Sequence, residues 1–211
     1  MKNYQIITGD VGASAKMSAR DREQLRAAFD FLAGGSVGDY DYFVRGDGFQ
    51  LLLTKDALRE SLRIKSYLYG LLAVRVRISI GIGTISYHGK RVSDSDGEAF
   101  WFSGRTLEEM KANREWIKVT TAIENWNNEW LVHAATLDYL EQARTQNQSE
   151  ALYWQIEGKT QQEIAGLLGI SQPSVHSRLK GTGWPLIEKI MNRYEQLQAH
   201  LTTDTDHVST I

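Results

Sequence analysis

The chain has 211 residues, of which 42% are hydrophobic and 24% charged, so it is long enough to bury at least one core. Its net charge of -2 and isoelectric point near 6.2 point to neither a nucleic-acid nor an acidic partner, and the absence of cysteine excludes disulfides, thiolate zinc sites and a cysteine nucleophile. The first ten residues lack the apolar core of a signal peptide and no apolar run approaches the roughly 20 residues of a membrane helix, so we expect a soluble, cytoplasmic protein without a membrane partner.

The first 120 residues alternate between strand-like and helix-like patterns. Residues 4–12 are a short apolar run ending in Gly-Asp, which predicts a strand and a loop, and Ser18 can cap a helix that the glycine pair at 34–35 ends. A hairpin with strands near 40–45 and 48–53 follows.

The pattern continues with a second amphipathic helix over 54–73 and a strand over 74–85 in which apolar residues alternate with polar ones. A helix over 98–113 and a strand over 116–122 complete the series, and we expect Trp101 and Phe102 of that helix in the core. The order β-α-β-β-α-β-α-β predicts an α/β (α+β) sandwich with helices on one or both faces of the sheet.

The chain is helical in character from about residue 124 onwards. One long helix begins there, polar residues near 145–149 indicate a linker, and a run of helices follows. We therefore predict an α/β domain over 1–123, a connecting helix and linker over 124–148, an all-α domain over 149–200 and a flexible tail over 201–211.

Residues 160–183, "TQQEIAGLLGISQPSVHSRLKGTG", resemble the helix-turn-helix of sigma-factor region 4 and of LuxR-type regulators. Thr160 can cap the first helix, Gly169 can adopt the left-handed turn, and Ser171 with Pro173 can open the second helix. In such a unit the second helix enters the major groove of DNA and its early residues reach base edges. The resemblance implies DNA-contacting roles for Gln172, Ser174, His176, Ser177, Arg178 and Lys180.

The alternative for this segment is a helical bundle that packs on the first domain or dimerises, and the charge of the segment supports it. Over 149–200, five basic residues (Lys159, Arg178, Lys180, Lys189, Arg193) are matched by five acidic ones (Glu150, Glu157, Glu163, Glu188, Glu195). Because DNA affinity depends largely on phosphate neutralisation, we expect weak binding by one copy and a homodimer as the functional form.

Two Gly-Asp pairs stand at predicted strand ends, at Asp10 and at Asp47. If the two strands are neighbours, both carboxylates meet at one edge of the sheet. Carboxylate oxygens are the ligands that Mg²⁺ prefers, and bound Mg²⁺ completes its shell with water and substrate phosphates.

Four segments in the first domain resemble the SatD family and, less closely, GGDEF and class III nucleotidyl cyclase domains. They are "TGDVGAS" (8–14), "RGDGFQLLL" (45–53), "RISIGIGTI" (77–85) and "DSDGEAFWFSGRTLEEMK" (94–111), in the family's order. The resemblance implies a ferredoxin-like palm, with Asp10 and Asp47 as magnesium ligands and the Val11 carbonyl as a third. Gly48 stands where those families carry an acid, which removes one carboxylate beside the metal.

The same resemblance makes Arg45 and Arg105 candidates for binding a nucleotide. The alternative for Arg105 is a surface ion pair with Glu108 or Glu109, and for Arg45 a solvent-exposed place beside the hairpin. Residues 55–91 are rich in Lys and Arg, which is typical of a solvated face; a surface that meets phosphate or DNA is the other interpretation.

Three functions follow from these observations. The one we favour is a transcriptional regulator that binds DNA through its helix-turn-helix and senses a nucleotide with Mg²⁺ through its cyclase-like domain. The second is a nucleotidyl cyclase or nucleotidyltransferase acting at Asp10 and Asp47, and the third is a catalytically inactive cyclase-like module that dimerises the DNA reader. The missing acid at Gly48 favours a protein that is not an enzyme.

Overall fold

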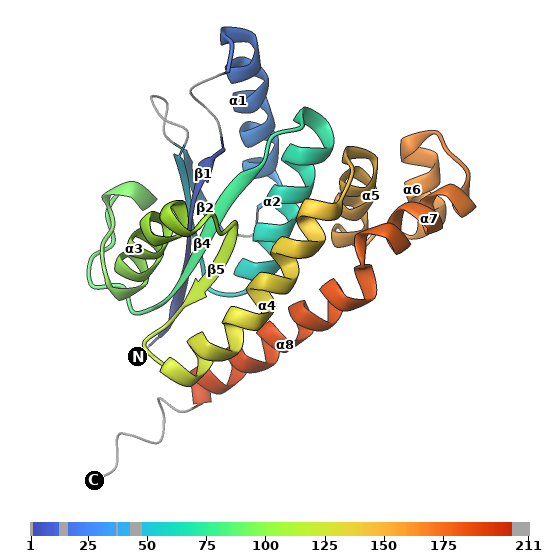
Figure 1. Ribbon diagram of the computed structural model, residues 1–211. Coiled ribbons are helices and arrows are strands. Elements are labelled where there is room, and N and C mark those ends of the chain that lie inside the picture. The colour runs from blue at the N-terminus through green and yellow to red at the C-terminus, as the bar shows by residue number, and fades with distance from the viewer. Residues whose placement is uncertain (1, 13–16, 37, 43–47, 204–211) are drawn as a thin grey trace.

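Within the described residues, five strands form one sheet in the order β2-β3-β1-β4-β5 (Figure 1). The computed structural model describes residues 2–12, 17–36, 38–42 and 48–203. The strands are β1 (Tyr4–Val11), β2 (Asp39–Tyr42), β3 (Gly48–Leu53), β4 (Val76–Gly83) and β5 (Ile117–Thr120). β1 lies in the centre, antiparallel to both β3 and β4, while β5 is parallel to β4.

Helices make up most of the remaining described chain. They are α1 (Ala19–Gly34), α2 (Ala57–Leu72), α3 (Glu98–Asn113), α4 (Glu124–Ala143), α5 (Gln146–Ile156), α6 (Gln161–Leu168), α7 (Gln172–Thr182) and α8 (Trp184–Thr203), with a short 3-10 turn, η2 (Val92–Asp94), before α3. None of the helices in these described ranges is long and apolar enough to span a membrane.

The mixed α/β class and the predicted order of elements over the first 120 residues are confirmed. From β1 to β4 the chain follows β-α-β-β-α-β, and the strand order β2-β3-β1-β4 is that of the split βαβ, or ferredoxin-like, arrangement. Ser18 caps α1 through a reciprocal hydrogen-bond pair with Asp21, as its sequence predicts.

The two faces of the sheet are covered by different helices (Figure 1). α1 and α2 pack on one face, where Ile7 and Val11 of β1 join the alternating apolar residues of β4 in the main core. α3 covers the other face, where Ile6 packs with Ala99 and Phe100. Asp10 follows the same alternation and lies on the α3 side of β1.

α4 and α8 run antiparallel beside the sheet and close the main core (Figure 1). The ring of Trp130 on α4 meets the ring of Tyr194 on α8 at 5.1 Å, and both residues are about 1% exposed. Arg193 Nε donates to Glu129 Oε1 at 2.6 Å along the same seam. The core is therefore continuous across residue 124, and α8 belongs to it, although the sequence places α8 with the helical domain.

α5 joins residues 149–200, here called the helical segment, to α2. A Cβ added to Gly70 on α2 would lie 2.9 Å from the backbone nitrogen of Glu150 on α5, so the two helices touch backbone to backbone. At the end of this seam Arg63 pairs with Glu157, which directly follows α5, and donates to Glu60 Oε1 at 2.9 Å. Burial is the main reason why the pKa of Glu60 is raised.

Two features of the chain differ from the expectation. The polar residues near 145–149 are the start of α5 rather than a linker, because Thr145 and Gln148 form a capping box. The basic stretch 55–91 is not one solvated face: Arg63, Lys65 and Arg77 are largely buried and ion-paired.

Candidate functional sites

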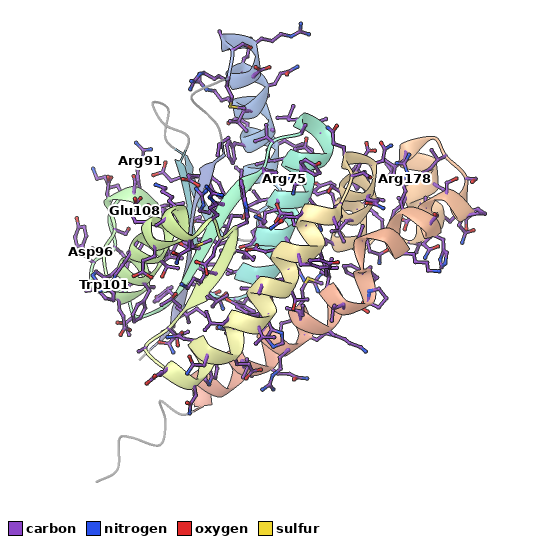
Figure 2. The ribbon with its side chains drawn as sticks, in the orientation of Figure 1. Arg75, Arg91, Asp96, Trp101, Glu108 and Arg178 are labelled. Carbon is purple, nitrogen blue, oxygen red and sulfur yellow. The ribbon has the colours of Figure 1, made fainter. Side chains whose placement is uncertain are left out.

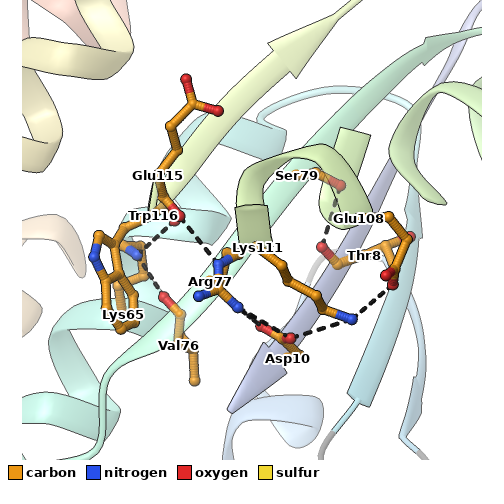
Figure 3. A network of polar contacts seen from close by, with 10 residues as sticks. All are labelled: Thr8, Asp10, Lys65, Val76, Arg77, Ser79, Glu108, Lys111, Glu115 and Trp116. Atoms are coloured by element: carbon orange, nitrogen blue, oxygen red, sulfur yellow. Dashed lines mark hydrogen bonds and ion pairs between the residues drawn. The ribbon is translucent and has the colours of Figure 1, made fainter. Parts of the chain in front are cut away.

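Asp10 lies near the end of the central strand, opposite Gly48 of β3 on one side and Arg77 of β4 on the other. The alternation that buries Ile7 and Val11 against α1 and α2 turns Asp10 towards α3. Figure 3 shows its carboxylate between Arg77 and Lys111. The Asp10 side chain is 13% exposed and that of Arg77 15% exposed, so the pair is largely withdrawn from water.

Both oxygens of the Asp10 carboxylate contact cations. Arg77 Nη1 donates to Oδ1 at 3.0 Å and to Oδ2 at 3.2 Å, and Lys111 Nζ lies 3.5 Å from Oδ2. Arg77 is itself held by the Glu115 carbonyl, which accepts from its Nε at 3.1 Å, and by the ring of Trp116. The arrangement is a cross-strand ion pair with a second cation from α3.

Lys111 bridges Asp10 to Glu108 on its own helix, with Nζ 2.6 Å from Glu108 Oε1 (Figure 3). The hydrogen bond to Glu108 is the main cause of the raised pKa of Lys111, and the Asp10 charge adds to it. The ammonium therefore stays charged across the physiological range and neutralises Asp10.

The surface between β1 and α3 is closed by hydroxyl hydrogen bonds. Thr8 and Ser103 lie 2.9 Å apart, oxygen to oxygen, Gln50 Nε2 donates to Thr8 Oγ1 at 3.2 Å, and Ser79 donates to the Ser103 carbonyl. These contacts occupy the polar groups beside Asp10 on the α3 face of the sheet.

Asp10 is the one predicted carboxylate ligand of magnesium within the described residues. A hard cation needs free carboxylate oxygens, and those of Asp10 are engaged by Arg77 and Lys111. Val11, whose carbonyl the resemblance implies as a third ligand, is the last residue of β1 and pairs in register with Val76. Across the described ranges no cluster of three or more acidic or His side chains is placed to hold a metal. Asp47 lies outside the described residues, and so does Arg45.

Arg105, a candidate for binding a nucleotide, forms the surface ion pair that the sequence analysis gives as the alternative. Its Nε donates to Glu109 Oε1 at 3.1 Å, and its guanidinium lies 5.1 Å from the ring centre of Trp101. Trp101 is 56% exposed, so the expectation of a core position is wrong for this residue. Phe102 is partly buried beside it.

α6 and α7 form two short helices joined by a tight turn. Gly169 ends α6 in the left-handed conformation, with φ of 63°, and Ser171 caps α7 with Pro173 in its first turn. Thr160 caps α6 through a capping box with Glu163. These local predictions are confirmed. The pair has its own small core, made with α5: Ala151, Ile164, Ala165, Val175 and Leu179.

α7 buries one side and presents the other to solvent. Val175 and Leu179 face the small core. The predicted DNA-contacting residues that are exposed are Gln172, Ser174, His176, Ser177 and Lys180. Arg178 differs, because its Nη1 lies 3.6 Å from Glu150 Oε2 and donates to the Asn147 carbonyl at 3.5 Å on α5.

No pattern in the sequence marks Arg77 and Lys111 as partners of Asp10. Arg77 stands on the polar side of an alternating strand, but only the register of β1 on β4 places it opposite Asp10. Lys111 lies on α3, about 100 residues along the chain from Asp10, and no local pattern marks that contact.

Comparisons with known proteins give a limited likeness of fold. No protein-family model matches the chain, and no curated protein matches it. Two solved structures of bacterial light-regulated adenylyl cyclases each match 56% of this chain at 18% identity. The match covers 75% of one with a TM-score of 0.41 and 42% of the other with a TM-score of 0.40. Both are partial likenesses, and a likeness at this level says nothing of activity.

Proposed function

We propose that this protein binds DNA through α7 and acts as a transcriptional regulator. The observation that carries the proposal is the two-sided character of α7, in which Val175 and Leu179 anchor the helix while Gln172, His176 and Lys180 are exposed. A helix held by its predecessor across a tight turn, with free polar side chains in its first two turns, has the geometry of a major-groove reader.

The mounting of this helix supports the same function. α6 and α7 project from the end of the molecule (Figure 1), with α5 fixing them to α2. Figure 2 shows Arg178 at this end, far from the sheet. A projecting, rigidly mounted helix can enter a groove without a clash from the α/β part of the chain.

A homodimer is part of the proposal. The helical segment is nearly neutral, so one copy supplies few phosphate contacts, and two copies would double them and read two half-sites. α4 exposes Val132 (68%) and Tyr139 (74%), which gives the chain an apolar surface on which copies could meet.

The enzyme alternative and magnesium-dependent nucleotide sensing both need a free carboxylate at Asp10. The contacts with Arg77 and Lys111 support instead an α/β domain that carries the DNA reader without turnover. The proposed function therefore includes no chemical step.

Fluorescence anisotropy with random-sequence duplex DNA tests the proposal through its salt dependence. We expect the full chain to bind, with log Kd rising linearly with log salt concentration, and Lys180→Gln to reduce that slope by about 1 per copy. Lys55→Gln, an exposed lysine on the α/β part, is the matched control. Absence of binding at low salt, or equal slopes for both variants, would overturn the proposal.

A further inference from the structure

A cleft of about 300 Å³ lies between α3 and α4, with β5 as its floor. Its main lining residues are Trp101, Phe102 and Arg105 from α3, Lys118 and Thr120 from β5, and Leu131 from α4. The volume is at the lower end of the range for small-molecule sites, which combine apolar walls with a few polar groups.

The walls of the cleft are apolar and open. Trp101 is 56% exposed and meets Phe102 edge to face at 5.4 Å, while Leu131 is 49% exposed. Figure 2 shows Trp101 on the outer side of α3. An indole face and a leucine on opposite sides of a cleft form a slot that suits a planar ring.

Two cations in the cleft retain unused hydrogen-bond donors. The Arg105–Glu109 pair is exposed on both sides (63% and 47%), and exposed pairs contribute little, so an anion can replace Glu109 at small cost. Lys118 is 21% exposed, and within the described residues its Nζ has no hydrogen bond and one ion-pair contact, at 3.7 Å from Glu115 Oε2.

The floor supplies a further donor. Thr106 Oγ1 and Thr120 Oγ1 lie 2.8 Å apart and share one hydrogen bond. Two hydroxyls carry two hydrogens, and the pair uses one of them, so the second remains for a ligand oxygen.

We propose that this cleft binds a planar aromatic molecule carrying an anionic group. The ring lies between Trp101 and Leu131, and the anion contacts Arg105 and Lys118. With Glu109 as the one acidic lining residue, the lining has a net charge of +1 from two cations and one carboxylate. Nucleoside monophosphates and aromatic carboxylates share this chemistry.

The cleft lies at one end of α4, and the other end of α4 reaches the helical segment. Leu131 belongs to the first half of the helix, whereas Leu140 in its second half lies beside Gly183, which ends α7. Ligand binding itself does not depend on the DNA-binding proposal and is measured without DNA.

Isothermal titration of the full chain with four probes, in the presence of EDTA, tests the proposal. AMP carries a ring and a phosphate, salicylate a ring and a carboxylate, adenosine a ring without a charge, and ribose 5-phosphate a phosphate without an aromatic ring. We expect AMP, salicylate or both to bind with Kd below roughly 1 mM, and adenosine and ribose 5-phosphate to bind at least about tenfold more weakly. Binding of only one of these two anions shows whether the cleft prefers a nucleoside monophosphate or an aromatic carboxylate.

Variants locate the binding. Trp101→Ala, Arg105→Gln and Lys118→Gln should each weaken it about tenfold or more, while Tyr87→Ala and Lys55→Gln, an exposed aromatic and an exposed lysine outside the cleft, should leave Kd unchanged. Melting temperatures verify that each variant folds. The proposal is overturned if neither AMP nor salicylate binds, if ribose 5-phosphate binds as tightly as they do, or if the cleft variants bind like the controls.

Discussion

Asp138 on α4 shows how burial sets the behaviour of a single residue. Its Oδ2 accepts the backbone N–H of Trp116 at 2.9 Å, while its Oδ1 is buried and receives no hydrogen bond from the described part of the chain. Burial is the main cause that raises its pKa from 3.8 to about 6, with Lys65 opposing the shift. The folded chain therefore holds the proton of the Asp138 carboxyl group more tightly than the unfolded chain does.

This raised pKa predicts a pH dependence of stability. Because the folded-state pKa lies above the unfolded one, the stabilisation is fully present below about pH 4 and is lost as pH rises through 6. Asp138→Asn removes the titration, so it should match the wild type at pH 4 and exceed its unfolding free energy by about 1–2 kcal/mol at pH 7.5. Urea unfolding at both pH values measures this. The control Glu188→Gln, on exposed α8 surface, should show no such divergence; a parallel pH profile for Asp138→Asn and wild type would contradict the account.

Asp10 illustrates a residue whose position the sequence predicts and whose cationic partners it does not reveal. Its place at the end of β1 followed from the sequence. Its neutralisation by Arg77 and Lys111 depends on strand register and on helix packing, neither of which a local pattern contains.

The ion pairs predict the response of Asp10 to substitution and to magnesium. Asp10→Asn should lower the unfolding free energy by about 1–3 kcal/mol, because it leaves Arg77 with a weaker partner in a largely buried place. Adding Mg²⁺ should shift the melting temperatures of wild type and variant equally. A magnesium-dependent rise confined to the wild type would show that the carboxylate is free to bind the ion.

At the scale of elements, the sequence predicted the helix caps and the turn that depend on neighbouring residues. The caps at Ser18, Thr160 and Ser171 and the turn at Gly169 are set by neighbouring residues, and all are found. The start of α5 was missed because a capping box at Thr145 lies within a polar stretch that also fits a linker. The burial of Lys65 was missed because its partner Glu141 is far along the chain.

The backbone contact between α2 and α5 predicts that adding one methyl group between the two helices lowers the stability of the protein. Gly70→Ala places Cβ within 3.0 Å of Glu150 backbone atoms, which should destabilise the protein by about 1–3 kcal/mol. Gly104→Ala is a matched control in α3, since its Cβ would meet nothing within 4 Å; it should stabilise by roughly 0.5–1 kcal/mol. Chemical denaturation compares the two, and a stabilising Gly70→Ala would show that α5 can move away from α2.

At the scale of the whole molecule, α8 makes one folding unit out of segments that the sequence separates. Its buried residues, Ile187, Ile190, Met191, Tyr194 and Leu197, complete the core of the sheet. The change in composition near residue 124 indicated a boundary, but composition cannot show that a later helix returns to pack on α4. DNA-binding tests by substitution are therefore cleaner than removal of the helical segment.

This packing predicts the result of shortening the chain. A protein ending at residue 183 would expose Trp130 and its apolar neighbours, and we expect it to lose cooperative thermal unfolding. Ending the chain at residue 203 should preserve the transition within a few degrees. A sharp calorimetric transition for the chain ending at 183 would mean that the helical segment is an independent domain after all.

Selection from a random duplex DNA library tests the central claim, that α7 reads base sequence, most directly. The full-length wild type should enrich a defined motif, and Gln172→Ala, which removes an exposed amide in the first turn of α7, should enrich the same motif with one base position relaxed, equivalent to about 1–3 kcal/mol of lost discrimination. Failure of the wild type to enrich any motif would contradict the account. The same holds if Gln172→Ala and separate variants at His176 and Ser177 all enrich the unchanged wild-type motif.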